Sequence, residues 1–298
     1  MAKSLGIHLT GRIASGVVEE KGACSLLFHF PENLEDTDSL LNVPLDGLID
    51  LVLQQAVRAT AECGPVDAIG LALPGIVRDG VVVDSPNLVQ LKGVRMTARM
   101  HKALAGAGIS APVTVLNDAD AIAAGVAAKQ GRLDHFIRLW TLGYGIGFGR
   151  YPYTPGIWEG GHCVVSLDST ENYCGCGGRG HLEGIMGHRA MRLRFLDMEP
   201  EEVFACAEKG DKRCSEFVRL WHRSLAAATA NSIHMEGPGR FYYTGFNVRF
   251  LDLKRLQHYL QQMVKMSPLQ SYSLEIVPMS DDLAVIGVAI AATQAATT

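Results

Sequence analysis

One short stretch, residues 159–184, gathers the side chains best suited to chemistry. It reads EGGHCVVSLDSTENYCGCGGRGHLEG and holds His162, Cys174, Cys176 and His181. Two thiolates and two imidazoles are the ligands of a closed tetrahedral zinc site, and the glycines between them let a short loop wrap a small ion. Cys174 and Cys176 are too close in sequence for an ordinary disulfide, which favours a shared metal. The alternative is two ordinary buried cysteines and two unrelated histidines, because the spacing matches no common zinc-finger pattern.

The same stretch carries two carboxylates that a structural zinc site does not need. Glu159 lies three residues before His162, and Glu183 lies two residues after His181. A metal that fixes the loop would hold both acids near a ligated histidine, whose free ring nitrogen can also meet a ligand.

This block resembles the signature of the ROK family of sugar kinases and repressors, which runs Glu-x-x-His and then Cys-x-Cys-Gly-x-x-Gly-Cys-x-Glu. The third cysteine of the signature is His181 here, and histidine is an equally good zinc ligand. The resemblance implies a structural zinc ion on the four side chains named above. It also implies that Glu159, His162 and Glu183 bind a sugar ring, and Trp158 beside them is a candidate to stack on a sugar face.

Composition limits the class of protein. The 298 residues carry a net charge of −4 and no basic run, so nothing indicates a nucleic-acid partner. The longest strongly apolar run, Leu283–Ala292, is too short to cross a bilayer, and the N-terminus has no signal-peptide core. Seven cysteines without a disulfide pattern fit a reducing compartment, so we expect a cytoplasmic protein. No helix-turn-helix segment precedes Leu5, so the resemblance is to the kinase branch of the family.

Predicted strands alternate with predicted helices along the chain, which indicates an α/β fold. Over nearly the whole chain the resemblance implies a two-lobed actin-like/sugar-kinase (ribonuclease H-like) fold with a zinc-stabilised loop and a ligand cleft between the lobes. We expect residues 1–116, with the terminal helix 281–298, to form the first α/β lobe. Residues 117–280 would form the second lobe, which carries the zinc loop.

A possible catalytic base lies in VTVLNDADAIAAG, where Asn117 and Asp118 stand between a predicted strand and a predicted helix. Phosphoryl transfer to an alcohol needs a carboxylate that accepts the proton of the attacking hydroxyl. In the family pattern Asp118 matches this base and Asn117 its neighbour on the sugar hydroxyls. The alternative is that both residues are ordinary helix N-caps. We interpret Asp120 as an acidic residue in the first turn of the helix, where its charge interacts favourably with the helix dipole.

Two further turns belong to the predicted sugar site. Gly75 follows a buried strand, where a tight turn brings backbone close to a ligand, and Asn87 lies in a Pro-Asn-Leu sequence that the family shares. An asparagine offers both a hydrogen-bond donor and an acceptor, as a polyol requires. The alternative, for each motif taken alone, is a turn with a purely structural role. Together with the groups of residues 159–184, these side chains favour a hexose or amino-hexose as substrate.

The predicted nucleotide side departs from the family pattern. The family opens with Asp-x-Gly-Gly-Thr, whereas this chain has His8-Leu9-Thr10-Gly11-Arg12. The second phosphate turn keeps Gly143 and Gly145 but replaces a small hydroxyl residue with Tyr144, and the late glycine run is reduced to Gly245 within Thr244–Asn247. Arg12 is either a replacement phosphate ligand or a surface arginine without a partner. The candidate nucleotide-binding residues are therefore Thr10, Gly11, Arg12, Gly143, Tyr144, Gly145 and Gly245.

Two functions follow from these patterns. The first is a kinase that uses Mg-ATP to phosphorylate a sugar, with Asp118 as base and, as is common in the family, a homodimeric assembly. The second is a catalytically silent pseudokinase that binds or senses a sugar. A kinase with another phosphoryl donor is a third interpretation, which the altered His8–Arg12 segment permits.

Overall fold

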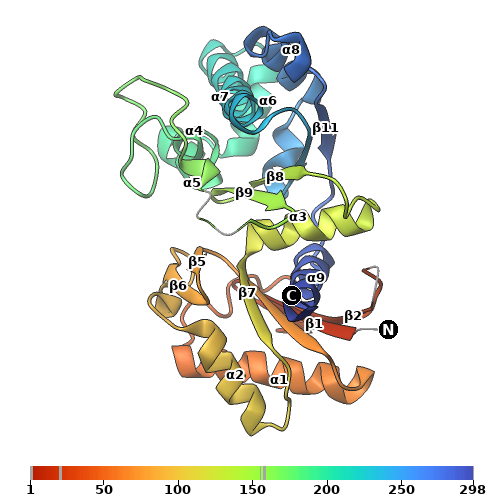
Figure 1. Cartoon of the computed structure of the whole chain (residues 1–298). Coiled ribbons are helices and arrows are strands. Elements are labelled where there is room, and N and C mark those ends of the chain that lie inside the picture. The colour runs from red at the N-terminus through yellow and green to blue at the C-terminus, as the bar shows by residue number, and fades with distance from the viewer. Residues whose placement is uncertain (1–2, 20–21, 155, 157–158, 298) are drawn as a thin grey trace. The chain divides into compact units, whose positions relative to one another are not determined.

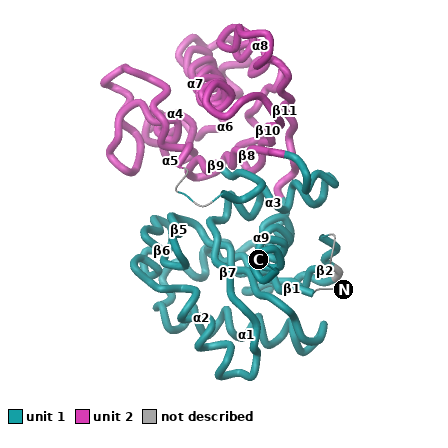
Figure 2. The backbone as a smooth tube through the Cα atoms, in the orientation of Figure 1, with its two compact units in different colours: residues 1–135, 149–157, 280–298 teal, residues 136–148, 158–279 magenta. Residues whose placement is uncertain are grey.

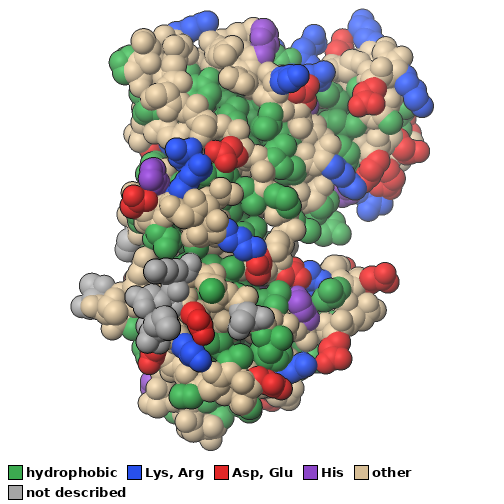
Figure 3. All heavy atoms as spheres, turned by 90° about the vertical axis from the view of Figure 1, so that its right-hand side faces the viewer, with side chains coloured by type: hydrophobic (Ala, Val, Ile, Leu, Met, Phe, Trp, Pro, Cys, Tyr) green, Lys and Arg blue, Asp and Glu red, His purple; other side chains and the backbone are tan. Residues whose placement is uncertain are grey.

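The computed structural model describes residues 3–19, 22–154, 156 and 159–297. The chain divides into two compact units (Figure 2). Unit 1 comprises residues 1–135, 149–157 and 280–298, and unit 2 comprises residues 136–148 and 158–279. None of the described helices is both long and apolar enough to cross a membrane. On the face seen in Figure 3, acidic and basic side chains are interspersed rather than gathered by sign.

Unit 1 is built on a five-stranded sheet in the order β3-β2-β1-β4-β7 (Figure 1). Its first three strands pair antiparallel, and β1, β4 and β7 pair parallel. The strands and helices of the unit are β1 Lys3–Leu9, β2 Ile13–Glu19, β3 Cys24–Phe30, α1 Leu45–Cys63, β4 Ala68–Leu73, the small β5–β6 sheet (Ile76–Arg78 and Val81–Asp84), α2 Met96–Gly106, β7 Val113–Asn117, α3 Asp118–Lys129 and α9 Asp282–Thr297.

The alternation of side chains along the strands separates two faces of this sheet. Leu5 and Ile7 point to one face, where they form a core with α1 and α2. On the other face α9 covers the sheet through residues such as Val285 and Val288 (Figure 1). A helix that is apolar on all sides, as Leu283–Ala292 is in the sequence, therefore lies buried in the unit.

Glycines permit the close approach of α9. A Cβ on Gly6 would lie 2.0 Å from the Val285 carbonyl oxygen, and one on Gly70 would lie 2.2 Å from that of Val288. Between α3 and α9, a Cβ on Gly125 would lie 1.9 Å from the Leu283 carbonyl oxygen. Because α3 packs so closely on α9, residues 117–135 belong to the same compact unit as the first sheet, whereas the sequence analysis assigned them to the second lobe.

Unit 2 contains a four-stranded sheet in the order β11-β10-β8-β9, with β10 parallel to both β8 and β11. The long helix α7 and its neighbours α4, α6 and α8 pack together around buried residues such as Trp221 and Leu225. The elements that lie wholly or partly in unit 2 are β8 Ile137–Leu142, β9 Ile146–Tyr151, α4 Leu182–Met186, α5 His188–Arg194, α6 Pro200–Glu208, α7 Lys212–Glu236, β10 Arg240–Thr244, α8 Leu253–Met263 and β11 Ser273–Ile276, with the 3-10 turns Gly160–His162, Phe246–Phe250 and Ser267–Leu269.

Gly287 tests the packing of α9 on α3. A Cβ at Gly287 would lie 1.7 Å from the Ala121 carbonyl oxygen, so Gly287→Ala must force the two helices apart. We expect the free energy of unfolding to fall by about 1–3 kcal/mol, measured by urea denaturation. Gly106→Ala is the matched control, because a Cβ at Gly106 meets nothing within 4 Å. A Gly287→Ala variant as stable as this control would contradict the packing described.

His222 makes the stability of unit 2 depend on pH. Its Nδ1 lies 2.8 Å from the Val218 carbonyl oxygen, and its Nε2 accepts a hydrogen bond from the amide of Asp252, the N-cap residue of α8. Burial lowers the pKa of His222 to about 4. The unfolded chain, with a histidine pKa of about 6.5, therefore binds the proton first as pH falls, and stability is lost between pH 6.5 and 4.

We expect His222 to cost about 2 kcal/mol of unfolding free energy between pH 7.5 and pH 5. Denaturation at the two pH values should show a smaller difference in His222→Gln than in the wild type. His258→Gln, which removes an exposed histidine of α8, serves as the control. An unchanged pH dependence in His222→Gln would show that its burial does not carry this effect.

Candidate functional site

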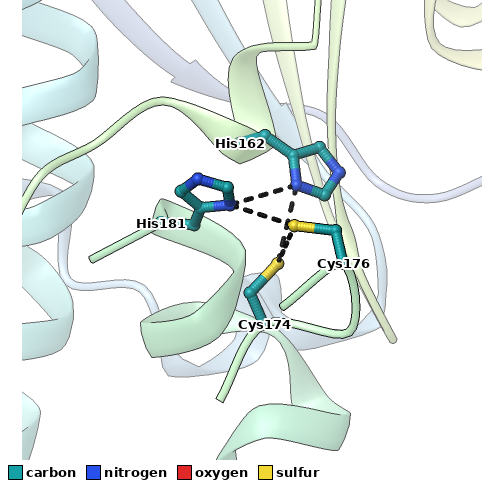
Figure 4. A group of neighbouring side chains, drawn as sticks. All are labelled: His162, Cys174, Cys176 and His181. Atoms are coloured by element: carbon teal, nitrogen blue, oxygen red, sulfur yellow. Dashed lines mark hydrogen bonds between the residues drawn. The ribbon is translucent and has the colours of Figure 1, made fainter. Parts of the chain in front are cut away.

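The predicted metal ligands come from three short segments of unit 2. His162 ends the 3-10 turn Gly160–His162, Cys174 and Cys176 share a turn, and His181 is the N-cap residue of α4. Glycines let these segments meet, since a Cβ on Gly161 would lie 1.9 Å from the Ile146 carbonyl oxygen. All four side chains point toward a common centre (Figure 4).

The spacing of the four ligand atoms fits a tetrahedral zinc ion. The Nδ1 atoms of His162 and His181 and the two Sγ atoms all lie within 4.8 Å of one another. Four of the separations are 3.3–3.5 Å. Ordinary zinc–nitrogen and zinc–sulfur bonds of about 2.0 and 2.3 Å give tetrahedral edges of about 3.3–3.8 Å. The residues present therefore suit a structural zinc ion, which would fix this loop when bound.

The protonation of the cysteine and histidine side chains affects how tightly this site can bind a metal. Burial raises the pKa of Cys174 to about 12; the backbone amide of Cys176 opposes this shift, and the Cys176 thiol and the Glu183 carboxylate add to it. Burial and the adjacent His162 lower the pKa of His181, which favours the neutral imidazole that a metal requires. A cation bound here must displace the Cys174 proton, so metal affinity should rise with pH.

Glu183 connects the metal loop to the glycine turn of residues 143–147. Its Oε2 accepts a hydrogen bond of 3.0 Å from the amide of Ile146, and its Oε1 lies 3.7 Å from Cys174 Sγ. A Cβ on Gly145 would lie 2.5 Å from the Glu183 carboxylate, so a larger residue there would displace this side chain. The metal loop thus fixes both this carboxylate and the turn that it contacts.

The two ring nitrogens of His162 face different groups. Its Nδ1 faces the metal centre, 3.5 Å from Cys174 Sγ, and its Nε2 lies 3.7 Å from the Glu159 carboxylate. Metal binding at Nδ1 would leave Nε2 to act together with Glu159. Glu159, His162 and Glu183 therefore all lie beside the Cys/His cluster. Trp158 lies outside the described residues.

Asn117 and Asp118 occupy the start of α3 in unit 1. Asn117 is the N-cap: its Oδ1 accepts from the Ala119 amide at 2.8 Å, and its Nδ2 donates to the Gly75 carbonyl at 2.7 Å. Asp118 accepts from the same Ala119 amide at 2.9 Å. The N-cap interpretation is thus right for Asn117, and the cap also joins two of the predicted sugar-binding segments.

The other predicted sugar-site residues of unit 1, Gly75 and Asn87, lie in neighbouring turns, and Asp120 follows Asp118 in α3. Gly75 has a φ of +114°, and a Cβ there would lie 2.2 Å from the Asp84 carbonyl oxygen, which brings the turn after β4 against the loop that contains Asn87. Asn87 itself is exposed. Asp120 accepts a hydrogen bond of 3.0 Å from the Arg150 amide, a tertiary contact beyond the helix-dipole role that the sequence indicated.

The hairpin turn of residues 8–12 is closed by contacts within unit 1. Arg12 makes two hydrogen bonds of 2.7 Å to the Asp281 carboxylate and one of 2.8 Å to the Leu34 carbonyl, so it is not a surface arginine without a partner. A Cβ on Gly11 would lie 1.9 Å from the Thr37 carbonyl oxygen. The Thr10 amide donates back to the Arg12 carbonyl at 2.8 Å. Little of this turn is left for a phosphate.

His8 stands where the family has a carboxylate. Its Nε2 is buried and has no hydrogen-bond partner among the described residues. Burial lowers the pKa of His8 to about 4; the charge of Asp281 opposes this shift, and that of Arg12 adds to it. A neutral imidazole cannot supply the negative charge that the family aspartate carries.

The predicted nucleotide residues of unit 2 do come together. Gly245, with a φ of +100°, begins the 3-10 turn Phe246–Phe250, and Asn247 in that turn donates from Nδ2 to the Gly143 carbonyl at 3.0 Å. The His188 amide donates to the same carbonyl at 3.0 Å. The sequence analysis missed His188, Asn247 and Asp281, because only tertiary contacts identify them.

The two sheets, the capped start of α3 and the Cys/His loop define the class of two-lobed sugar-kinase folds. A model of the ROK family matches residues 13–295, and the chain belongs to that family. It is 30% identical over 189 residues to a glucokinase of Pyrobaculum calidifontis, a match that covers 58% of this chain and 60% of that protein.

Solved structures show the same fold over nearly the whole chain. The ROK hexokinase of Thermus thermophilus superposes with a TM-score of 0.82 at 22% identity, covering 99% of each chain. A ROK family glucokinase of Streptomyces griseus, solved with glucose and AMPPNP, gives a TM-score of 0.71 at 21% identity, covering 98% of this chain and 100% of that one. The predicted fold class is confirmed.

Loss of a metal ligand should destabilise unit 2. Cys176→Ser removes one ligand, so we expect zinc content to fall from about one ion per chain to well below half and the melting temperature to drop by several degrees. Metal analysis and thermal melting measure the two effects. Cys206→Ser, a cysteine of α6 outside the cluster, is the control. Equal zinc content in both variants would exclude Cys176 as a ligand.

Proposed function

We propose that this chain is a carbohydrate kinase that transfers the γ-phosphoryl group of Mg-ATP to a hydroxyl of a hexose or amino-hexose. Family membership and the glucokinase relative support the class of reaction. The observation that carries the proposal is the start of α3, where Asn117 caps the helix and bonds the Gly75 turn while Asp118 stands next to it.

In the proposed reaction Asp118 accepts the proton of the attacking sugar hydroxyl. That oxygen forms a bond to the γ-phosphorus as the bond to the bridging oxygen of ADP breaks, so sugar phosphate and ADP leave. Asn117, Asn87 and the Gly75 turn bind sugar hydroxyls from unit 1. Glu159, His162 and Glu183 are also proposed to bind sugar hydroxyls, and zinc would keep their loop in place.

The nucleotide assignments are also part of the proposal. The residues assigned to the donor are Gly143, Tyr144, Gly145 and Gly245, together with Thr10, Gly11 and Arg12 for its phosphates. The unit 1 hairpin offers the fewest phosphate contacts, because its arginine, Arg12, is already paired with Asp281. The kinship to named kinases nevertheless favours catalysis over a silent sugar-binding protein. The homodimer stays a prediction.

Asp118→Asn tests the proposal. Loss of the base should slow ADP formation with a hexose by about 10²–10⁴-fold in a coupled assay, because the amide cannot accept the hydroxyl proton. Sugar-induced thermal stabilisation should persist in this variant. Asp120→Asn is a matched control in the same helical turn, since an amide oxygen can still accept from Arg150. If both variants keep wild-type turnover, Asp118 is not the base.

A further inference from the structure

In unit 1, the side chains of the hairpin that would hold the donor phosphates are either already paired or neutral. Both Arg12–Asp281 hydrogen bonds measure 2.7 Å, and His29 Nε2 lies 3.1 Å from the same carboxylate. His8, where the family has an aspartate, is neutral at pH 7. Donor affinity must therefore come mainly from other residues.

In unit 2, three rings surround the second glycine turn. The ring centroids of Tyr144 and Phe246 are 5.0 Å apart, those of His188 and Phe246 are 5.3 Å apart, and those of Tyr144 and His188 are 6.0 Å apart. All three pairs meet edge to face, at angles of 65–87°. Phe246 and His188 are half-buried, whereas Tyr144 is 66% exposed, so its ring is the one accessible to a ligand.

A buried side chain holds the rings in place. Asn247, which is fully buried, donates to the Gly143 carbonyl, and its Oδ1 lies 3.2 Å from His188 Nδ1. Residues on both sides of the cluster are thereby tied to the glycine turn. An exposed aromatic ring on a turn fixed in this way loses little conformational entropy when it binds a flat ligand.

The turn itself has limited capacity for an anion. Three amides of the turn already donate hydrogen bonds within the protein. The Gly143 amide donates to the Gly145 carbonyl, the Ile146 amide to the Glu183 carboxylate, and the Gly147 amide to the Thr141 hydroxyl. At most the two amides at the tip, of Tyr144 and Gly145, can face a phosphate. Two backbone amides beside the exposed Tyr144 ring would suit a nucleotide, which joins a flat base to a phosphate chain.

We propose that Tyr144, Phe246 and His188 form a stacking platform for the base of the phosphoryl donor, and that Tyr144 is its specificity-determining residue. The inference rests on the proposed kinase function and assigns the donor to the nucleotides. The donor is held chiefly by its aromatic base, which replaces the affinity lost at the unit 1 hairpin. Inorganic polyphosphate, which has no base, gains nothing from the platform.

Calorimetric titration of the full chain with ADP and with inorganic tripolyphosphate tests this role. Tyr144→Thr restores the small hydroxyl residue of the family pattern and should weaken ADP binding about 5- to 100-fold, the equivalent of about 1–3 kcal/mol of stacking. Tyr144→Phe keeps the ring and should bind ADP as the wild type does. Tripolyphosphate affinity should be the same in all three proteins. Thermal melting checks that each variant is folded.

Other results overturn the platform. If Tyr144→Thr binds ADP as tightly as the wild type or more tightly, the ring is neutral or an obstruction. If it weakens tripolyphosphate equally, Tyr144 acts on the phosphates and not on a base. Sugar phosphorylation with tripolyphosphate and no ADP binding would refute the platform and preserve the kinase, whereas Tyr144-dependent ADP binding without sugar turnover would refute the kinase alone.

Discussion

The close meeting of two thiols and two imidazoles in residues 162–181 is the constraint on which the functional part of unit 2 depends. Two thiolates this close would repel each other, and neutral thiols gain little from the contact, so we infer that the arrangement serves to bind a cation. His162 belongs to the cluster and Glu183 lies beside it, with the glycine turn attached to Glu183. Metal binding here would therefore fix together the positions of the groups that we propose bind the sugar and the donor.

The acceptor and donor sides differ in how far they keep the family pattern. On the acceptor side, Asn117 caps α3 and ties it to the Gly75 turn, so the polar groups expected there have a fixed framework. On the donor side, the unit 1 hairpin has exchanged a free carboxylate for an internal ion pair between Arg12 and Asp281. In the proposed kinase, the acceptor side thus keeps the family pattern, whereas the donor side would hold its phosphoryl donor in a different way.

Local sequence patterns predicted much of the fold. Apolar periodicity and clear end signals predict helices at Leu45–Ala61 and Asp211–Glu236, and the observed helices α1 and α7 lie close to these ranges. The small β5–β6 sheet was missed, because its strands of three and four residues are too short to show a period. Tertiary packing decided the rest: α3 joins unit 1 because small residues let it contact α9.

The candidate site shows the same division. The four metal ligands could be read from residue type and spacing, and the structure brings all four together. Asp281 could not be found in this way, because it lies 269 residues from Arg12 in the chain. Nor could His188 and Asn247, whose roles arise only where α5 and the turn after β10 meet the glycine turn. Sequence patterns identify chemistry that is local, and pairings between distant segments require the structure.

X-ray absorption at the zinc edge of the purified, zinc-loaded chain tests the central constraint most directly. We expect one bound ion with two sulfur ligands at about 2.3 Å and two nitrogen ligands at about 2.0 Å, supplied by Cys174, Cys176, His162 and His181. A shell made mainly of oxygen, or one with fewer than two sulfur atoms, would contradict the metal-fixed loop and the arrangement of sugar-binding groups that depends on it.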